Sequence, residues 1–189
     1  CSSNQKQIST YMFMYTDMNG GVIVNDDGNI QPANNGKWQS MLMKLYMPSI
    51  ETVDWSFYDS KTQLPYGMFA CPSSFAGMPG VEGSRHYGVN RYYASYHGGG
   101  GRIMRKEGRI KRPSERCMFL DVDRNAAWAT PHAKSPDTMV YSGKPGEQWW
   151  RHGGGGNVTY ADGHVGWKKR GDFPNGYSAD LSAPGYFWG

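Results

Sequence analysis

The side chains best suited to chemistry lie late in the chain, where nine residues separate His152 from the pair Asp162 and Gly163. A histidine and an aspartate that meet in space can share a proton or bind a metal ion. Asp121 and Asp123 add two carboxylates at a spacing of two, which places both on one face of a strand. A metal site in this chain would therefore draw on His152 and Asp162, with Asp121, Asp123 or His164 as further ligands.

A simpler interpretation of the same residues is structural. Asp-Gly is a strong turn signal, so Asp162 and Gly163 would form the two-residue turn of a hairpin, and His152 would hydrogen-bond a backbone group. The four glycines at 153–156 offer a cation only their backbone carbonyls, whereas calcium needs six to eight oxygen ligands. The sequence favours this structural interpretation over a metal site.

Catalysis finds little support in the sequence. Ser114, His152 and Asp121 supply the residue types of a hydrolase triad, but no Gly-x-Ser-x-Gly elbow is present. Cys117 opens an apolar run, where a cysteine is usually buried and inert. The glycine runs at 98–101 and 153–156 lack the Gly-Lys-Ser/Thr ending of a phosphate-binding loop. We therefore predict no enzymatic activity.

An aromatic-rich set of residues suggests a different class of function. Exposed rings stack on sugar rings, which would make the chain a carbohydrate- or ligand-binding surface module. The residues that would do so are Tyr92, Tyr93, Trp149 and Trp150. The alternative, which the sequence favours, is that these rings pack a core that has few leucines.

Composition limits the possible classes of protein. The 189 residues suffice for one domain with a real core. The chain has 26 glycines, 14% aromatic residues and only 19% charged residues. This composition favours a loop-rich fold with β-structure and is typical of extracellular proteins. The net charge is +4, and basic residues gather at 102–116, but no nucleic-acid-binding motif accompanies them, so we predict a solvated loop and no nucleic-acid partner.

Three cysteines bear on the compartment in which the chain folds. Cys1, Cys71 and Cys117 contain no Cys-x-x-Cys pair, so a structural zinc site is not expected from their spacing. In an oxidising compartment they allow one disulfide and one free thiol. The sequence leaves open which two cysteines pair.

The elements that must position these residues follow from periodicity and turn signals. Apolar side chains at helical spacing predict a helix over 1–18, which the glycines at 20–21 end. A second helix is predicted over 37–47, a strand over 118–123, and a hairpin with alternating burial over 157–167. A helix followed by several short strands indicates an α+β fold with an antiparallel sheet and long loops, in one domain over 1–189.

Four segments share their order and spacing with a known family. Cys-x-x-Asn-x-x-Gln-Ile at 1–8 runs into Met-Tyr-Thr-Asp-Met-Asn-Gly at 14–20, and Phe-Ala-Cys-Pro-Ser follows at 69–73. Tyr-Gly-Val-Asn lies at 87–90, and the stretch from histidine to Asp-Gly lies at 152–163. With these segments the chain resembles a bacterial family that has prepilin-type N-termini and a C-terminal His-x9-Asp-Gly motif. This family is related to the pseudopilins of type II secretion.

The resemblance implies a pilin-like fold, in which an N-terminal helix packs on an antiparallel sheet. Relatives carry a leader removed by a prepilin peptidase, prepilin-type methylation, and then a hydrophobic helix of membrane-spanning length. That helix would precede Cys1 and is absent from this chain, so residues 1–18 would be its soluble continuation. The implied location is the cell envelope outside the cytoplasm, periplasmic or at the cell surface, with the missing helix as the membrane anchor.

The function implied by the resemblance is structural. The chain would be the soluble domain of a pseudopilin-like envelope protein that assembles with other pseudopilin-like subunits through its N-terminal helix, as in type II secretion. Major pseudopilins bind calcium in a C-terminal loop, so calcium is the cofactor that the analogy suggests. The alternative is a carbohydrate- or ligand-binding surface module on the same scaffold, with a glycan as its partner.

Overall fold

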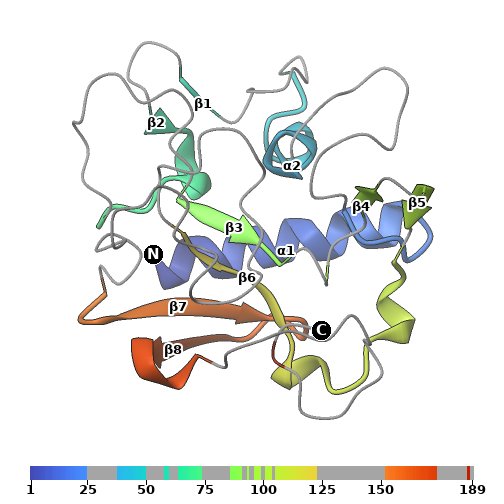
Figure 1. Cartoon of the computed structure of the whole chain (residues 1–189). Coiled ribbons are helices and arrows are strands. Elements are labelled where there is room, and N and C mark those ends of the chain that lie inside the picture. Colours follow the sequence, from blue (N-terminus) through green and yellow to red (C-terminus); the bar gives the residue numbers. More distant parts are fainter. Residues whose placement is uncertain are drawn as a thin grey trace.

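A computed structural model describes residues 1–24, 38–49, 58–59, 64–73, 86–90, 93, 96–98, 101–103, 105–122, 152–173 and 187. Four residues named above lie outside this part of the chain: Tyr92, Asp123, Trp149 and Trp150. The described residues form an N-terminal helix and a four-stranded antiparallel sheet, which confirms the α+β prediction (Figure 1).

The first helix, α1 (Ser2–Met18), matches the predicted element closely. Its buried residues are polar as well as apolar: Gln5, Ile8, Ser9, Met12 and Thr16. The Gly20 N–H bonds to the carbonyl of Asp17 and the Gly21 N–H to that of Thr16, at 3.3 and 2.9 Å. This is a Schellman ending, and Gly20 adopts a φ of 62° there without the steric cost of a side chain.

The main sheet runs in the order β3, β6, β7, β8, and every neighbouring pair is antiparallel. The strands are β3 (Tyr87–Val89), β6 (Cys117–Asp121), β7 (Gly155–Tyr160) and β8 (Val165–Lys169). The predicted strand at 118–123 is thus present, but it begins one residue earlier and ends at Asp121. Figure 1 shows α1 lying along β7, and the two elements are in contact.

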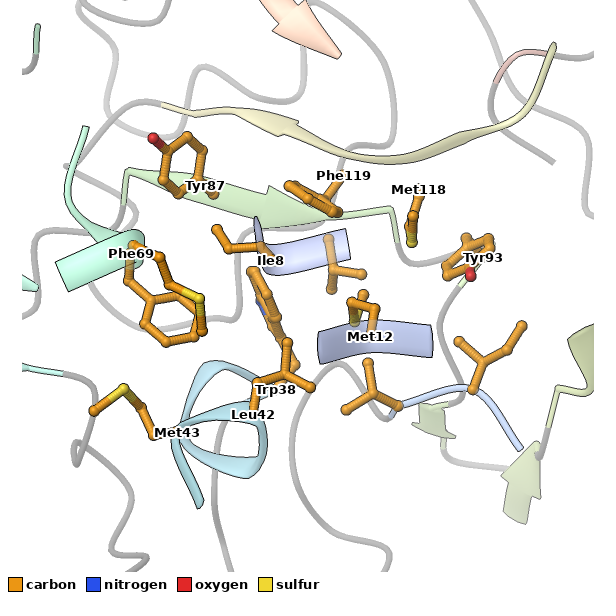
Figure 2. Packing of buried hydrophobic residues seen from close by; sticks show 14 of the residues in the cluster. Ile8, Met12, Trp38, Leu42, Met43, Phe69, Tyr87, Tyr93, Met118 and Phe119 are labelled. Carbon is orange, nitrogen blue, oxygen red and sulfur yellow. The ribbon is translucent and has the colours of Figure 1, made fainter. Parts of the chain in front are cut away.

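One face of the sheet, together with α1, forms the larger hydrophobic core. The second helix, α2 (Trp38–Tyr46), closes this core, and Trp38 is fully buried with its ring centre 6.0 Å from those of both Phe69 and Phe119 (Figure 2). Ile8 and Met12 of α1 belong to the same cluster. Full burial of one such side chain contributes about 2 kcal/mol, so this face supplies much of what holds α1 to the sheet.

The opposite face of the sheet is also covered, which the sequence did not indicate. Leu120 and Val158 are fully buried there with Cys117, Phe173 and Phe187. On the α1 side, the neighbouring Thr159 is equally buried. Along β7, the predicted alternation of buried and exposed residues is therefore wrong, because other parts of the chain cover both faces of this strand.

The turn between β7 and β8 differs by one residue from the predicted form. Tyr160 N–H bonds to the His164 carbonyl at 2.9 Å, so three residues rather than two connect the strands. Gly163 N–H bonds to the Tyr160 carbonyl at 2.8 Å, and Gly163 has a φ of 86°. A turn that ends with a left-handed glycine is the usual three-residue hairpin, and it explains the longer loop.

The remaining described elements are short. Two small hairpins pair β1 (Tyr58–Asp59) with β2 (Leu64–Pro65), and β4 (Tyr96–Gly98) with β5 (Gly101–Ile103). Four 3₁₀ helices are η1 (Gly67–Phe69), η2 (Glu107–Arg109), η3 (Pro113–Glu115) and η4 (Arg170–Asp172). Among the described residues, no helix is both long enough and apolar enough to cross a membrane.

Candidate functional site

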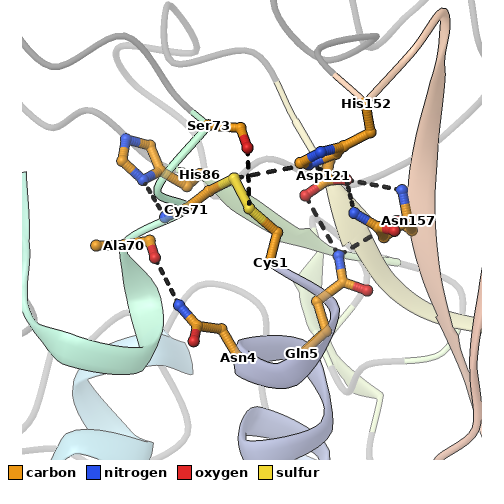
Figure 3. Close-up of a disulfide and its surroundings, with 10 residues drawn as sticks. All are labelled: Cys1, Asn4, Gln5, Ala70, Cys71, Ser73, His86, Asp121, His152 and Asn157. Carbon is orange, nitrogen blue, oxygen red and sulfur yellow. Dashed lines mark hydrogen bonds and ion pairs between the residues drawn. A yellow bond between two sulfur atoms is a disulfide. The ribbon is translucent and has the colours of Figure 1, made fainter.

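A disulfide joins Cys1 to Cys71, with 5.2 Å between their Cα atoms (Figure 3). Cys1 is the N-cap residue of α1, and Cys71 follows the 3₁₀ helix η1, so the bond connects segments 70 residues apart in sequence. The third cysteine, Cys117, is a free thiol with no exposed surface, and burial raises its pKa well above the ordinary value. The expected burial of Cys117 is confirmed, and the disulfide between Cys1 and Cys71 is the pairing that the sequence left open.

His152 lies against the disulfide and against Asp121. Its Nε2 atom is 3.2 Å from Oδ2 of Asp121 and 3.6 Å from Sγ of Cys71. The His152 side chain is 15% exposed and Asp121 is fully buried. In the tautomer that carries its proton on Nε2, the imidazole donates a hydrogen bond to this carboxylate, which water does not reach.

The buried carboxylate of Asp121 has further donors. The backbone N–H and the side-chain amide of Asn157 donate to Oδ2 at 2.7 and 3.1 Å, and the side-chain amide of Gln5 lies 3.3 Å from Oδ1. A buried carboxylate is tolerated only where it is paired and hydrogen-bonded. This one has partners from α1, from β7 and from His152, which lies just before β7. Removal of Asp121 would leave these donors buried without their acceptor.

Gln5 joins the first turns of α1 to the sheet. It has no exposed surface, donates to the Asn157 carbonyl at 3.2 Å and accepts a hydrogen bond from the Thr159 hydroxyl at 3.0 Å. One residue earlier, the amide of Asn4 donates to the Ala70 carbonyl at 2.6 Å. The start of α1 is therefore bonded to β7, to β6 and to the segment before Cys71.

The Tyr-Gly-Val-Asn segment and its neighbour support the same region. His86 accepts a hydrogen bond at its Nδ1 atom from the Cys71 N–H, at 2.7 Å. Asn90 is buried, and its side chain donates to the Cys117 carbonyl at 2.7 Å while its N–H bonds to Met118. These bonds fix the strands on which Asp121 and Cys71 depend for their positions.

The glycines after His152 shape the turn that presents its imidazole. Gly153 and Gly154 have φ values of 68° and 81°, which residues with a side chain rarely adopt. At Gly155, an added Cβ would lie 2.5 Å from the indole ring of Trp167, and that indole donates to the His152 carbonyl at 2.7 Å. The glycine run therefore lets the chain turn sharply and lets Trp167 cover the strand.

Asp162 and Gly163 act at the other end of β7. Oδ1 of Asp162 is 2.6 Å from Nδ1 of His164 and accepts the His164 N–H at 3.1 Å. Desolvation raises the pKa of Asp162, but the backbone and side-chain hydrogen bonds and the charge of His164 together hold that pKa below its ordinary value. An added Cβ on Gly163 would lie 2.7 Å from the ring of Phe13, so the glycine also allows α1 to pack closely against the turn.

The two ends of the motif lie at opposite ends of β7, and a strand of this length spans about 20 Å. Along β7, Gln5 of α1 bonds to Asn157 and Thr159, and beyond the strand Gly163 lies against Phe13 of α1. The motif therefore follows α1, with His152 before β7 and Asp162 after it.

The structure consequently separates the residues predicted to form one metal site. His152 and Asp121 meet, but Asp162 is at the far end of β7 and pairs with His164 instead. Asp123 lies outside the described residues. No calcium-binding set of carboxylates is assembled from the described members of the predicted group.

Two further predictions concern side chains at the surface. Tyr93 is only 4% exposed and belongs to the main core, so its ring is not available to stack on a sugar. In the basic stretch, Lys106, Arg109, Lys111 and Arg112 are exposed, as expected of a solvated loop. Arg116 differs, since it is 3% exposed and its Nε donates to the Lys111 carbonyl at 3.3 Å.

Sequence reasoning missed the residues that complete the site. Cys1, Cys71, Gln5 and Asn157 were not singled out as functional, although they meet at one place with His152 and Asp121. Three of the four family-like segments each carry a polar or sulfur-containing residue to which the sequence assigned no function, and this was the signal for these residues. In the fold they meet beside His152 and Asp121.

The chemical capacity of the site follows from its state. His152 and Asp121 resemble the base and orienting carboxylate of a hydrolase triad, but the atom that faces the imidazole is a disulfide sulfur, which is not a nucleophile. As a disulfide, the two sulfurs are not thiolate ligands for a metal either.

Comparisons with protein-family models, curated proteins and solved structures gave no match to this chain.

Proposed function

We propose that this chain is the extracytoplasmic domain of a pseudopilin-like envelope protein with a structural role. In this role, α1 is the element that joins the domain to its assembly, and the other elements are held rigidly on α1. The observation that supports this proposal is the concentration of bonds at the beginning of α1. The disulfide and the hydrogen bonds of Asn4 and Gln5 attach its first turns to distant segments.

The position of these bonds matters for a mechanical role. A helix end leaves four backbone N–H groups without partners, and local unfolding usually begins at such ends. Cys1 provides no side-chain cap to α1, and the covalent bond to Cys71 instead prevents this end from separating from the domain. A force applied along α1 would pass through Gln5 and Asp121 into the sheet, and through the disulfide into the segment that follows η1.

The redox chemistry of the site supports a location outside the cytoplasm. Structural disulfides form and persist in oxidising compartments and are rare where thioredoxin and glutathione keep thiols reduced. The disulfide in this chain joins residues that are 70 positions apart and belong to two different segments of the folded domain, so it is part of the folded structure. The proposed periplasmic or cell-surface location provides the conditions that this bond needs.

The outer face of α1 is available for contacts with other subunits. Exposed residues recur at helical spacing along it: Ser3, Gln7, Thr10, Met14 and Asp17. Met14 is 45% exposed, and Met18 at the end of the helix is 70% exposed. Apolar groups on an otherwise polar helix face suit a packing contact with a second copy of the same helix.

A fractionation experiment tests this function in cells that express the gene product. Free thiols are blocked with one alkylating reagent at lysis, disulfides are then reduced, and the released thiols are labelled with a second reagent of different mass. We expect Cys1 and Cys71 to carry the second label, and the protein to be membrane-associated and accessible to protease in spheroplasts. A soluble cytoplasmic protein with Cys1 and Cys71 both carrying the first label would refute the proposal.

A second candidate, a carbohydrate-binding surface, is favoured by one observation. Trp167 is 54% exposed, and its indole is held in place by the hydrogen bond to the His152 carbonyl. A fixed, exposed aromatic ring is a platform on which a sugar ring can stack. Titration of the tryptophan fluorescence with oligosaccharides tests this candidate: a saturable change that Trp167→Ala abolishes would support it, and no change with either protein would exclude it.

A further inference from the structure

The geometry points to a second state of the disulfide cluster: once the bond is reduced, Cys1, Cys71 and His152 bind Zn²⁺. The two sulfur atoms and one imidazole nitrogen lie within 4.8 Å of one another. Thiolate sulfur and imidazole nitrogen are the ligands that zinc prefers in proteins. This site shares only the ligand His152 with the predicted calcium site and takes a different metal, and it does not depend on the proposed envelope function.

The distances between donor atoms fit a tetrahedral zinc ion. Zinc binds sulfur at about 2.3 Å and nitrogen at about 2.05 Å, so sulfur and nitrogen ligands on a tetrahedral ion lie about 3.6 Å apart. Nε2 of His152 and Sγ of Cys71 are 3.6 Å apart. Two thiolates on the same ion lie about 3.8 Å apart. Cys1 can supply this separation when the bond is broken, because it is only partly buried and precedes the first turn of α1.

The surroundings of the three ligands favour a cation and thiolates. The carboxylate of Asp121 is fully buried and its Oδ2 is 3.2 Å from Nε2 of His152. Asp121 is not among the three ligand residues, so its carboxylate would offset the charge of the cation from beside the site. Gln5 and Asn157 would continue to orient it, as outer-shell partners do in metal sites. Cys1 adjoins the N-terminus of α1, where the helix dipole favours a thiolate.

A phosphine converts the disulfide state into the state that binds the metal. A phosphine reductant attacks one sulfur of the disulfide, the S–S bond breaks, and water supplies the oxygen of the phosphine oxide and the two protons of the new thiols. Zn²⁺ then replaces both thiol protons, which pass to solvent. The imidazole gives up its contact with Asp121, carries its one proton on Nδ1 and binds the metal through Nε2. The disulfide and the zinc site use the same sulfur atoms and therefore exclude each other.

Cobalt binding to the purified chain tests the proposal. The protein is reduced with a phosphine, the reductant is removed under nitrogen, and Co²⁺ is added as a spectroscopic probe for zinc. We expect one equivalent to give the ligand-field bands of tetrahedral Co²⁺ and a thiolate-to-cobalt charge-transfer band, and one equivalent of Zn²⁺ to remove both. The oxidised protein should give neither band. Absence of the charge-transfer band from reduced protein would overturn the proposal.

Variants assign the ligands. Cys117→Ser is the matched control, because it removes the one thiol that lies outside the cluster, and its spectrum should equal that of the reduced parent. Cys71→Ser should lose the charge-transfer intensity of one thiolate, and His152→Ala should weaken Zn²⁺ binding at least tenfold in competition with a chelator dye. Unchanged spectra and affinities in both variants would refute the ligand assignment.

A measurement on the unsubstituted chain keeps the test valid if a variant does not fold. Reduced protein is alkylated with and without Zn²⁺, and the modified cysteines are identified by peptide mass spectrometry. We expect Zn²⁺ to slow alkylation of Cys1 and Cys71 together, with the near-ultraviolet circular dichroism of the folded protein retained. Equal alkylation rates with and without zinc would contradict the proposal and would leave the fractionation result unaffected.

Discussion

Replacement of Cys1 and Cys71 together by serine should lower the free energy of unfolding by about 4 kcal/mol. The bond connects residues 70 positions apart. In the chain-entropy model, closing a loop of that length removes about 15 cal/mol/K from the unfolded ensemble, which is about 4 kcal/mol at 25 °C. Since small domains are stable by only 5–15 kcal/mol, such a loss is a large part of the total.

Urea unfolding, followed by tryptophan fluorescence and by far-ultraviolet circular dichroism, measures this loss. Coincident transitions from the two probes would justify a two-state fit, and the midpoint of the variant should fall by about 2 M for a slope near 2 kcal/mol/M. The parent protein reduced in place provides a control that changes no side-chain volume. A midpoint within about 0.3 M of the oxidised parent, in both the variant and the reduced protein, would refute the reasoning.

Three further substitutions, one of them with a matched control, test the site and its surroundings. Asp121→Ala should lower the free energy of unfolding by about 3 kcal/mol, measured in urea, because it leaves buried donors without an acceptor. Gly163→Ala should cost about 2 kcal/mol through its positive φ and the approach of α1, whereas Gly108→Ala, at an open site, should change stability by less than about 0.5 kcal/mol; equal effects would contradict this account. Because the folded pKa of Asp162 is lowered, the stability that this group adds is present above its unfolded pKa and is lost as pH falls through the folded value. Asp162→Asn should therefore destabilise the protein at pH 7 and have little effect at pH 2, as thermal unfolding at the two pH values would show.

Local signals in the sequence were enough to predict local structure. The glycines at 20–21 ended α1 where predicted, and Asp-Gly at 162–163 marked the hairpin. The added residue in the hairpin loop escaped prediction because the two-residue and three-residue turns both favour a glycine there. The predicted alternation along β7 failed because it depends on what covers each face, and Phe187, which covers one of them, lies far along the chain.

Contacts between distant segments could not be predicted in the same way. The motif of His152, nine residues and Asp-Gly led to the pairing of His152 with Asp162, and Asp121 was only a further carboxylate for the same site. A sheet brings together residues of neighbouring strands rather than residues at the two ends of one strand, and β6 and β7 pair so that Asp121 faces the start of β7. The disulfide likewise required the fold, since three cysteines allow three pairings.

The main claim is that α1 joins this domain to other copies, and crosslinking along its outer face tests that claim most directly. Thr10→Cys is placed on the exposed face of α1 in the gene product and expressed in cells, with Lys169→Cys on the exposed part of β8 as a control. After treatment with a membrane-permeable bismaleimide, we predict covalent oligomers from Thr10→Cys and monomers from Lys169→Cys. Monomers alone from Thr10→Cys, and from Gln7→Cys and Met14→Cys on the same face, would contradict the account.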